Sequence, residues 1–455
     1  MSELFTKFKC PNCGSAELSD NKNQINCGSC GLSFPKTGQI PWLFPQPIKE
    51  IYDWQNRYHL FLENTRLDTT RLKHDASTEG LLASTKRRLS RLVQAKTEHA
   101  REVTRILKAL DIKDENGPGF ASLGAGTELP STQSLMGYYA NLCRDWSYGE
   151  EENTRCLAEI LNVLGEDKEL GSLGVIGSGA CRLAYDIHRK CEVKETINTD
   201  INPYLLLVAQ RLVSGKSLNL YEFPIAPRSL EDSAVKLKCK APEPLTQDFY
   251  FALADGMNPV FAEKSLNTIL TPWLIDIVHQ DFKDQVLRFN HCLELGGRWL
   301  NFGSVVFYHD DQKICYSVDE VLEIVRSSGF DIERYRHEEI PYLHSPHSCQ
   351  RRYERVLTFS ARKTDHKELP KERFNYLPEW LRDITVRVPK TDKSIQQSMV
   401  HQSLGKIMSL IDGKRSIKDM AASADFLQLP VDNAEAVIRN VLTKFFNDNV
   451  KGQQF

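Results

Sequence analysis

The sequence predicts an α/β protein with a doubly wound, Rossmann-like sheet in the middle of the chain. Strand patterns and helix patterns alternate between about residues 167 and 363, which is typical of a parallel sheet covered by helices. The first unit of this region contains a buried strand (173–176), a glycine turn, a helix (about 182–189) and a second strand that ends at Asp200. This order is typical of a nucleotide-binding sheet.

The glycine turn lies between Gly177 and Gly179. Glycines let a ligand approach the backbone closely, and the following helix, which begins near Arg182, offers unpaired N–H groups at its N-terminus. Asp200 stands where an acid can accept hydrogen bonds from ribose hydroxyls. Cys181 stands near the place of the third glycine of a dinucleotide fingerprint. The turn therefore favours S-adenosylmethionine over NAD, because S-adenosylmethionine has no pyrophosphate to cradle.

The composition is that of an ordinary globular protein. The 455 residues suffice for two or three domains, and 41% of them are hydrophobic and 26% charged. The formal net charge of -2 provides no basic field for nucleic acid, and no apolar run approaches the roughly 20 residues that span a bilayer. The N-terminus has no signal-peptide pattern, so twelve cysteines indicate a reducing compartment. We expect a cytoplasmic protein that binds neither membrane nor nucleic acid.

Residues 1–45 predict a zinc ribbon. Cys10 and Cys13 form one C-x-x-C knuckle, and Cys27 and Cys30 form a second. Four thiolates complete a tetrahedral zinc site and leave no open position for a substrate, so the zinc is expected to be structural. Two disulfides are the disfavoured alternative. The segment resembles the small zinc-ribbon domain that activates tRNA methyltransferases, and we interpret it as a folding staple or a docking module.

Residues 46–166 are expected to be a helical segment that leads into the catalytic domain. Apolar residues recur at helical spacing between residues 84 and 112, whereas residues 114–133 are rich in Gly and Pro and predict a loop. The basic run at residues 86–88 is more typical of a solvated helix face than of a phosphate contact. The motif RDWS begins at Arg144, between two helical runs.

Residues 167–363 form the predicted catalytic domain. Asp255 follows the third strand, where an acid can bind the amino group of adenine. A helix, a Gly-Gly turn, a strand, a second helix and a terminal hairpin follow, which is the usual order in class I S-adenosylmethionine-dependent methyltransferases. The further cofactor-side candidates are Arg182, Gly256 and Thr271.

Residues from about 138 to 363 resemble the carnosine N-methyltransferase family. The matching motifs are RDWS, GSGACRLAYDI, TPWLIDIVHQ, WLNFGSVVFYH and the ending FSARK. In that family the arginine of the RDW motif, the glycine turn and the acids after the second and third strands contact the cofactor. The resemblance therefore implies cofactor contacts for Arg144, Gly177, Gly179, Asp200 and Asp255.

The resemblance also implies an acceptor site. Asp276 falls on the family's substrate aspartate, whose carboxylate would accept the N–H of an imidazole and so fix its tautomer. His279, one helical turn further on, could position the substrate or shuttle a proton. The remaining acceptor candidates are Tyr308 and His309, which stand where the family reads YHF, and a tyrosine that is either Tyr342 or Tyr353.

The chain departs from the family pattern at three positions near these motifs. Asn141 replaces a glutamine, Cys181 replaces a glycine, and His309 is displaced by one position. These departures leave the prediction of an S-adenosylmethionine site intact. They leave open whether the acceptor is carnosine or another compound with an imidazole.

Residues 364–455 predict a polar linker and a helical, winged-helix-like module. Three helices are expected, with a break at Asp412, a cap at Ser416 and a new start at residues 430–433. The phrase LIDGKRSIKDMA resembles small winged-helix modules, among them peptide-recognition domains of peptide-modifying enzymes and DNA-binding domains. Basic residues are mixed with acids here, which favours a peptide or protein partner over DNA.

Together these patterns predict an S-adenosylmethionine-dependent N-methyltransferase with a structural Zn²⁺. The expected acceptor is a histidine-like imidazole in a small molecule or a peptide. The ribbon suggests an RNA, tRNA or protein methyltransferase as the alternative, although the N/D-P-P-Y/F motif of base methylation is absent. A catalytically inactive methyltransferase fold that serves in binding is the third hypothesis.

Overall fold

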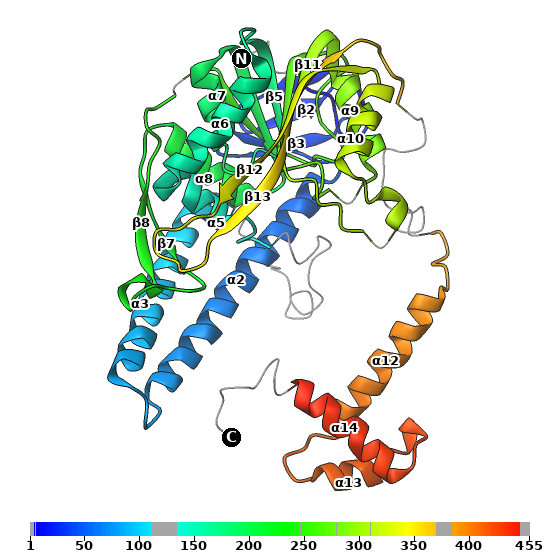
Figure 1. Ribbon diagram of the computed structural model, residues 1–455. Helices are drawn as coiled ribbons and strands as arrows, with labels where there is room; N and C mark the ends of the chain where they lie inside the picture. The colour runs from blue at the N-terminus through cyan, green and yellow to red at the C-terminus, as the bar shows by residue number, and fades with distance from the viewer. Residues whose placement is uncertain are drawn as a thin grey trace. The chain divides into compact units, whose positions relative to one another are not determined.

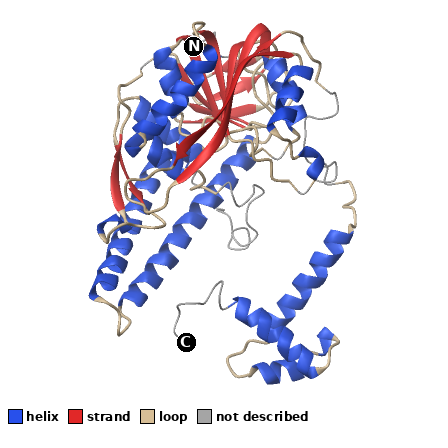
Figure 2. Cartoon of the chain, in the orientation of Figure 1, coloured by secondary structure: helices blue, strands red, loops and turns tan. Residues whose placement is uncertain are grey.

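The computed structural model describes residue 4 and residues 6–110, 134–245, 247–278, 280–309, 311–369 and 385–445. The chain divides into two compact units, Met1–Glu372 and Arg373–Phe455 (Figure 1). The first contains a large sheet, and the described elements of the second are helices (Figure 2).

A mixed sheet of eleven described strands forms the centre of the first unit. In sheet order the strands are β1 (Leu18–Asp20), β2 (Gln24–Cys27), β3 (Ser33–Thr37), β4 (Ile40–Leu43), β9 (Phe249–Ala254), β6 (Glu192–Asp200), β5 (Glu169–Ile176), β10 (Leu266–Pro272), β11 (Leu293–Gly303), β13 (Arg352–Lys363) and β12 (Phe330–Tyr342). From β4 to β11 all neighbouring strands are parallel, and β13 is antiparallel to both β11 and β12.

Helices cover both faces of the parallel part of this sheet. The helices α6 (Glu150–Leu164), α7 (Arg182–Lys190) and α8 (Pro203–Val213) lie on one side, and α9 (Phe282–Cys292) and α10 (Val318–Ser327) lie on the other (Figure 1). This arrangement confirms the predicted doubly wound α/β fold. Its parallel strands bring their carboxyl ends to one edge, where the predicted cofactor residues follow β5, β6 and β9.

Local sequence explains where several of these helices begin. Asn202 caps α8 by accepting a hydrogen bond from the backbone N–H of Tyr204 at 3.0 Å, and Pro203 occupies the first helical turn. Ser317 and Glu320 form a capping box at the start of α10. The apolar faces of the helices pack on fully buried sheet residues such as Trp299.

The region predicted as a zinc ribbon continues the central sheet. Strand β4 pairs in parallel with β9, so that Trp42 stands opposite Leu253 and Leu43 opposite Ala254. Asp255 follows β9 directly. The ribbon strand therefore shares backbone hydrogen bonds with the strand that delivers one of the predicted cofactor acids.

The remaining elements of the first unit surround this core. Two long helices form an adjacent pair that extends from the sheet in Figure 1, and a separate two-stranded hairpin follows α8 in the chain. The predicted loop at residues 114–133 lies outside the described residues. These elements are α2 (Pro47–Ala76), α3 (Ala83–Leu107), η1 (Lys108–Leu110), α5 (Tyr139–Cys143), η3 (Arg144–Tyr148), β7 (Leu218–Glu222), η4 (Glu231–Ser233), β8 (Val235–Cys239) and η5 (Gln312–Ile314).

The second unit is a small helical bundle in its described part. Its buried core includes Ile407, Met420 and Ile438. Its elements are α12 (Asp392–Ser409), α13 (Ile417–Ala422), η6 (Asp425–Leu427) and α14 (Val431–Phe445). Across the described parts of both units, no helix combines the length and the apolar character that a membrane crossing requires.

Candidate active site and zinc site

The glycine turn follows β5 at the carboxyl edge of the sheet. Gly177 and Gly179 both have left-handed backbone conformations, with φ of 70° and 54°. A Cβ atom on Gly177 would lie 2.6 Å from Cδ1 of Leu274, so packing requires glycine there. A Cβ on Gly179 would meet nothing within 4 Å. The backbone at Gly179 is therefore open to a ligand on the side where a side chain would project.

Asp200 closes the glycine turn from the end of β6. Its Oδ2 accepts a hydrogen bond from the N–H of Gly179 at 2.7 Å, and its Oδ1 accepts one from the N–H of Asn202 at 2.8 Å. Burial raises the pKa of Asp200 to about 6, although these two hydrogen bonds by themselves lower it. The sequence-predicted acid thus lies beside the sequence-predicted turn, with lone pairs left for further donors.

Asp255 and its neighbours complete this edge of the sheet. The Oδ1 atom of Asp255 accepts from the N–H of Met257 at 2.9 Å, and burial raises the pKa of this carboxyl. Gly256 lies next to Ile176, because a Cβ there would come within 3.3 Å of the isoleucine Cγ2. Asp255 and Gly256 are therefore held at the end of β5, close to the glycine turn.

Thr271 is the penultimate residue of β10, and its side chain is buried. Its fully buried hydroxyl accepts from Nε1 of Trp299 at 2.9 Å and lies 2.9 Å from Oδ1 of Asn301. These contacts use the hydroxyl to join β10 to β11. The side chain of Thr271 therefore serves the register of the two strands.

The RDWS motif forms one turn of π-helix, η3, ahead of α6. The buried Arg144 donates to Oδ1 of Asp145 from Nε at 2.9 Å and from Nη2 at 2.6 Å. Trp146 donates from Nε1 to the carbonyl of Ala180 at 2.9 Å, which ties the π-turn to the glycine turn. π-Helical turns occur often at functional sites.

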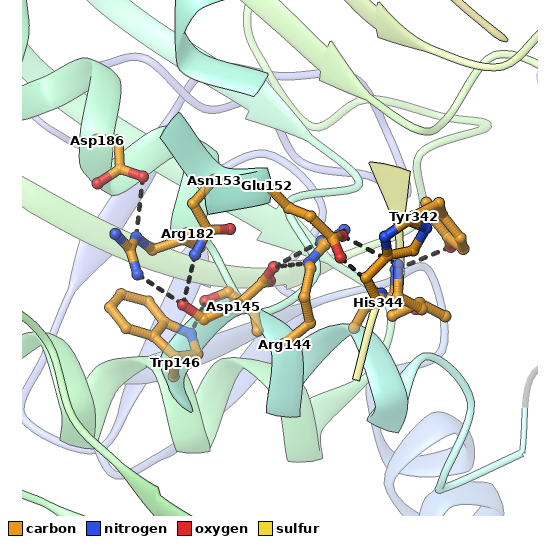
Figure 3. Close-up of polar contacts among 12 residues, drawn as sticks. Arg144, Asp145, Trp146, Glu152, Asn153, Arg182, Asp186, Tyr342 and His344 are labelled. Atoms are coloured by element: carbon orange, nitrogen blue, oxygen red, sulfur yellow. Dashed lines mark hydrogen bonds and ion pairs between the residues drawn. The ribbon is translucent and has the colours of Figure 1, made fainter. Parts of the chain in front are cut away.

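Arg182 strengthens the same connection from the start of α7. Its Nη1 donates to the carbonyl of Asp145 at 2.6 Å and its Nε to Asp186 at 2.9 Å (Figure 3). Its Nη2 donates to Glu150 at 2.8 Å. All of its guanidinium nitrogens thus have protein partners. Arg182 positions the π-turn, while Arg144 lies closer to Tyr342 in this network (Figure 3).

Asp276 lies in the segment that follows β10. Its Oδ2 accepts from Oγ of Ser304 at 2.7 Å and from the N–H of Val306 at 2.9 Å. Its Oδ1 is buried and has no hydrogen-bond partner among the described residues. Burial raises the pKa of this carboxyl. A buried carboxylate oxygen without a donor is costly, so this atom is suited to accept a hydrogen bond from a ligand.

Of the two candidate tyrosines, Tyr342 lies in this region. Its hydroxyl accepts from Nδ2 of Asn141 at 2.9 Å, and its ring lies 4.9 Å from that of Trp273. Tyr353 is 56% exposed and packs its ring against His344. The end of β12 therefore brings Tyr342, not Tyr353, next to the π-turn.

Tyr138 is a site candidate that sequence reasoning missed. Burial raises its pKa, and the charges of Asp200, Tyr342 and Asp276 raise it further. Tyr138 is 44% exposed and stands at the start of α5, the helix whose Asn141 contacts Tyr342. Nothing in the sequence distinguished it from an ordinary aromatic residue ahead of a helix.

The other described acceptor candidates follow Val306, whose N–H donates to Asp276. Tyr308 is 95% exposed, and His309 is exposed and accepts at Nδ1 from the N–H of Asp311 at 2.9 Å. Phe307, their neighbour, packs on the core instead. His279 lies outside the described residues.

The four ribbon cysteines converge on one point. Sγ of Cys10 lies 3.7 Å from Sγ of Cys30, and Sγ of Cys13 lies 3.6 Å from Sγ of Cys27. Zn–S bonds of about 2.3 Å in a tetrahedron place sulfur atoms roughly 3.8 Å apart. All four sulfur atoms lie within 4.8 Å of one another, so the cluster fits a zinc ion.

Another group of three candidate metal ligands in the described chain is Glu263, His291 and His366. Nζ of Lys363 lies 3.1 Å from Nδ1 of His366 and donates to it. Nε2 of His366 lies 3.5 Å from Glu263. The Lys363 amine beside His366 would repel a metal cation, so we interpret this group as a polar network.

Comparisons with solved structures found proteins of partly similar fold. Similar solved structures include an S-adenosylmethionine-dependent methyltransferase from Mesorhizobium loti, at 13% identity and a TM-score of 0.31, covering 45% of this chain and 95% of that one. Phosphoethanolamine N-methyltransferase 2 of Haemonchus contortus is 13% identical, with a TM-score of 0.34 over 52% of this chain and 58% of that one. A complex of the Haloferax volcanii Trm112 methyltransferase activator with a methyltransferase gives 11% identity and a TM-score of 0.33, over 51% of this chain and 98% of that one.

The search of curated proteins found no match. The family model for carnosine N-methyltransferase matches residues 128–365, just over half of the chain. This range contains the π-turn, the glycine turn and the segment of Asp276. The chain therefore belongs to the carnosine N-methyltransferase family and is an S-adenosylmethionine-dependent methyltransferase.

Proposed function

We propose that this methyltransferase transfers a methyl group to a ring nitrogen of an imidazole, in a histidine-like small molecule or a peptide. One observation carries the proposal: Oδ1 of Asp276 is a buried acceptor with no partner among the described residues. An imidazole N–H matches this need. The same ring offers a second nitrogen whose lone pair is free to attack a methyl group.

The role proposed for Asp276 is to orient and polarise the acceptor. S-adenosylmethionine supplies a methyl group that its sulfonium already activates. The carboxylate accepts the N–H of one ring nitrogen, which fixes the neutral tautomer and turns the other nitrogen toward the methyl group. The methylated ring is positively charged, so its N–H shares its proton with the carboxylate of Asp276. The raised pKa of this carboxyl favours its taking up that proton. Ser304 and Val306 hold the other oxygen in place throughout.

The cofactor is proposed to bind along the carboxyl edge of the sheet. Asp200 would accept the ribose hydroxyls, and Asp255 with Gly256 would line the adenine end. The open backbone face at Gly179 supports this placement. Arg144 would face the cofactor's carboxylate, and its guanidinium lies 5.8 Å from the ring of the acceptor-side Tyr342.

Cofactor affinity should fall as the pH is lowered through about 6, the pKa to which burial raises Asp200. The ribose hydroxyls donate to the charged carboxylate, so bound cofactor lowers this pKa and releases a proton when the pH is below about 6. Each pH unit below that value should weaken binding by up to about tenfold. Calorimetric titration with S-adenosylhomocysteine between about pH 5 and 7.5 measures this slope. If the affinity of Asp200→Asn depended on pH with the same slope, the titrating group would be one other than Asp200.

We also propose roles for the zinc ribbon and for the helical unit beyond residue 372. Zn²⁺ is proposed to bind Cys10, Cys13, Cys27 and Cys30 as a structural ion. The helical unit beyond residue 372 is proposed to contact a peptide or protein partner, and the enzyme is proposed to act in the cytoplasm on a soluble acceptor.

An acceptor panel tests the proposed reaction. The zinc-loaded full chain is incubated with S-adenosylmethionine and an imidazole dipeptide, and the product is examined by mass spectrometry and by NMR of the ring. We expect one added methyl group on a ring nitrogen. A dipeptide already methylated at the attacking nitrogen should be inert. Methylation of a histidine-free control peptide, or transfer to the dipeptide's amino group, would contradict the proposal.

A further inference from the structure

Glu152 is a buried acid that neither the sequence motifs nor the proposed chemistry employs. It lies in the first turn of α6, directly after the π-turn, and is 4% exposed. Its neighbour Glu151 is exposed. An acid buried to this extent requires partners for its lone pairs.

The partners of Glu152 come from two distant parts of the chain. Oε2 accepts from the N–H of Leu343 at 3.0 Å, and Oε1 accepts from the N–H of His344 at 2.6 Å. Oε2 also lies 3.4 Å from Nη1 of Arg144. Figure 3 shows the carboxylate between the Arg144 guanidinium and the backbone at His344. One side chain therefore contacts both the RDWS motif and the segment that follows Tyr342.

The two N–H groups need this acceptor because the sheet ends before them. The register of β12 with β13 ends at Tyr342, which stands opposite Arg352. Leu343 has a left-handed backbone with φ of 55°, which is unfavourable for a leucine. A carboxylate that accepts two adjacent N–H groups with charge-assisted hydrogen bonds holds the chain in this turn.

The turn at Leu343 and His344, when Glu152 holds it, fixes the position of Tyr342. The tyrosine ring is surrounded by Trp273 at 4.9 Å, the guanidinium of Arg352 at 4.6 Å and that of Arg144 at 5.8 Å. Its hydroxyl takes a hydrogen bond from Asn141. These contacts persist only while the backbone leaves β12 in the observed direction.

We propose that Glu152 is a positioning residue that fixes the turn after Tyr342 and thereby places this tyrosine at the acceptor side of the active site. The assignment of an acceptor side rests on the proposed function. Through Arg144 the same carboxylate joins this turn to the cofactor side. Glu152 acts on catalysis through Tyr342 and does not touch the reacting atoms.

The test compares Glu152→Gln with Glu151→Gln in the full, zinc-loaded chain. Glutamine keeps the shape of the side chain but offers one acceptor oxygen where two N–H groups need one each. We expect hydrogen exchange of the peptide spanning residues 341–346 to accelerate by at least about tenfold in Glu152→Gln, the scale of one lost charge-assisted hydrogen bond. The Glu151→Gln control removes an equal charge from the same helical turn and should exchange like the wild type.

Kinetics separate positioning from general destabilisation. Glu152→Gln should raise the KM for the acceptor by about tenfold and change the Kd of S-adenosylhomocysteine by less than about threefold. Adding Leu343→Gly should restore part of the acceptor KM, because glycine adopts the left-handed turn without the carboxylate. A variant that merely unfolds would lose cofactor binding as well and would not be rescued.

Two outcomes would overturn the proposal. The first is unchanged exchange in residues 341–346 of a folded Glu152→Gln protein. The second is an equal loss of cofactor and acceptor affinity that Leu343→Gly does not relieve. If the wild type methylates no imidazole, the proposed function fails, while the exchange and cofactor measurements still decide the role of Glu152.

Discussion

Replacement of Asp276 by asparagine should lower kcat/KM for the imidazole acceptor by about 10- to 100-fold and leave the affinity for S-adenosylhomocysteine within about twofold. Asparagine keeps the shape of the side chain, but its amide presents one oxygen and one N–H₂ group. Ser304 and Val306 already require an acceptor at Oδ2. The atom that faces the imidazole N–H would then be the amide nitrogen of asparagine. Both groups are hydrogen-bond donors, so they repel one another.

Steady-state kinetics and calorimetry on the same preparation measure both quantities. Asp331→Asn, an exposed substitution on β12, provides the matched control and should behave like the wild type. If Asp276→Asn retained full acceptor turnover, Oδ1 would have no part in acceptor binding. If it lost cofactor binding, the carboxylate would belong to the cofactor side.

Removing zinc should destabilise the first unit by about 5 kcal/mol or more, since structural zinc contributes about 10 kcal/mol or more in small domains. The thermal midpoint should fall by about 10 °C or more. Without the ion the cysteines take up protons as neutral thiols and no longer hold the two knuckles together, so the ribbon strands β1 to β4 lose their anchor. Because β4 pairs with β9, cofactor affinity should fall as well, through the loosened end of β9 at Asp255.

Differential scanning fluorimetry with a strong chelator, followed by S-adenosylhomocysteine titration, checks both effects. Cys27→Ser should reproduce them because Cys27 is buried in the cluster, whereas Cys349→Ser replaces an exposed cysteine outside it and should not. Metal analysis should find one zinc per chain in the wild type. A chelated protein with an unchanged midpoint would show that the ribbon folds without metal.

Local patterns predicted the parts of this protein that depend on neighbouring residues. The glycine turn, the strand before it and the acid Asp200 are close in sequence, so spacing alone indicated a nucleotide edge. The four cysteines have a fixed ligand geometry, and their convergence followed from two knuckles. Asp276 came from a family motif, and the structure adds that its Oδ1 lacks a protein partner.

Long-range contacts explain what the sequence did not reveal. Glu152 meets Leu343 from 191 residues away in the chain, and no local pattern records such a pair. The hydroxyl of Thr271 is taken up by the neighbouring strand, which depends on sheet register. The exposure of Tyr308 depends on which neighbour packs inward, and Phe307 takes that place.

The most direct test of the account is calorimetric titration of the zinc-loaded protein with S-adenosylmethionine and S-adenosylhomocysteine, with Asp200→Ala beside it. Glu192→Ala is the matched control, because it removes an exposed acid at the opposite end of the same strand, β6. We predict micromolar binding in the wild type and in Glu192→Ala, and a loss of at least about tenfold in a folded Asp200→Ala. Undiminished binding in Asp200→Ala would contradict the placement of the cofactor at this edge, and with it the acceptor geometry built around Asp276.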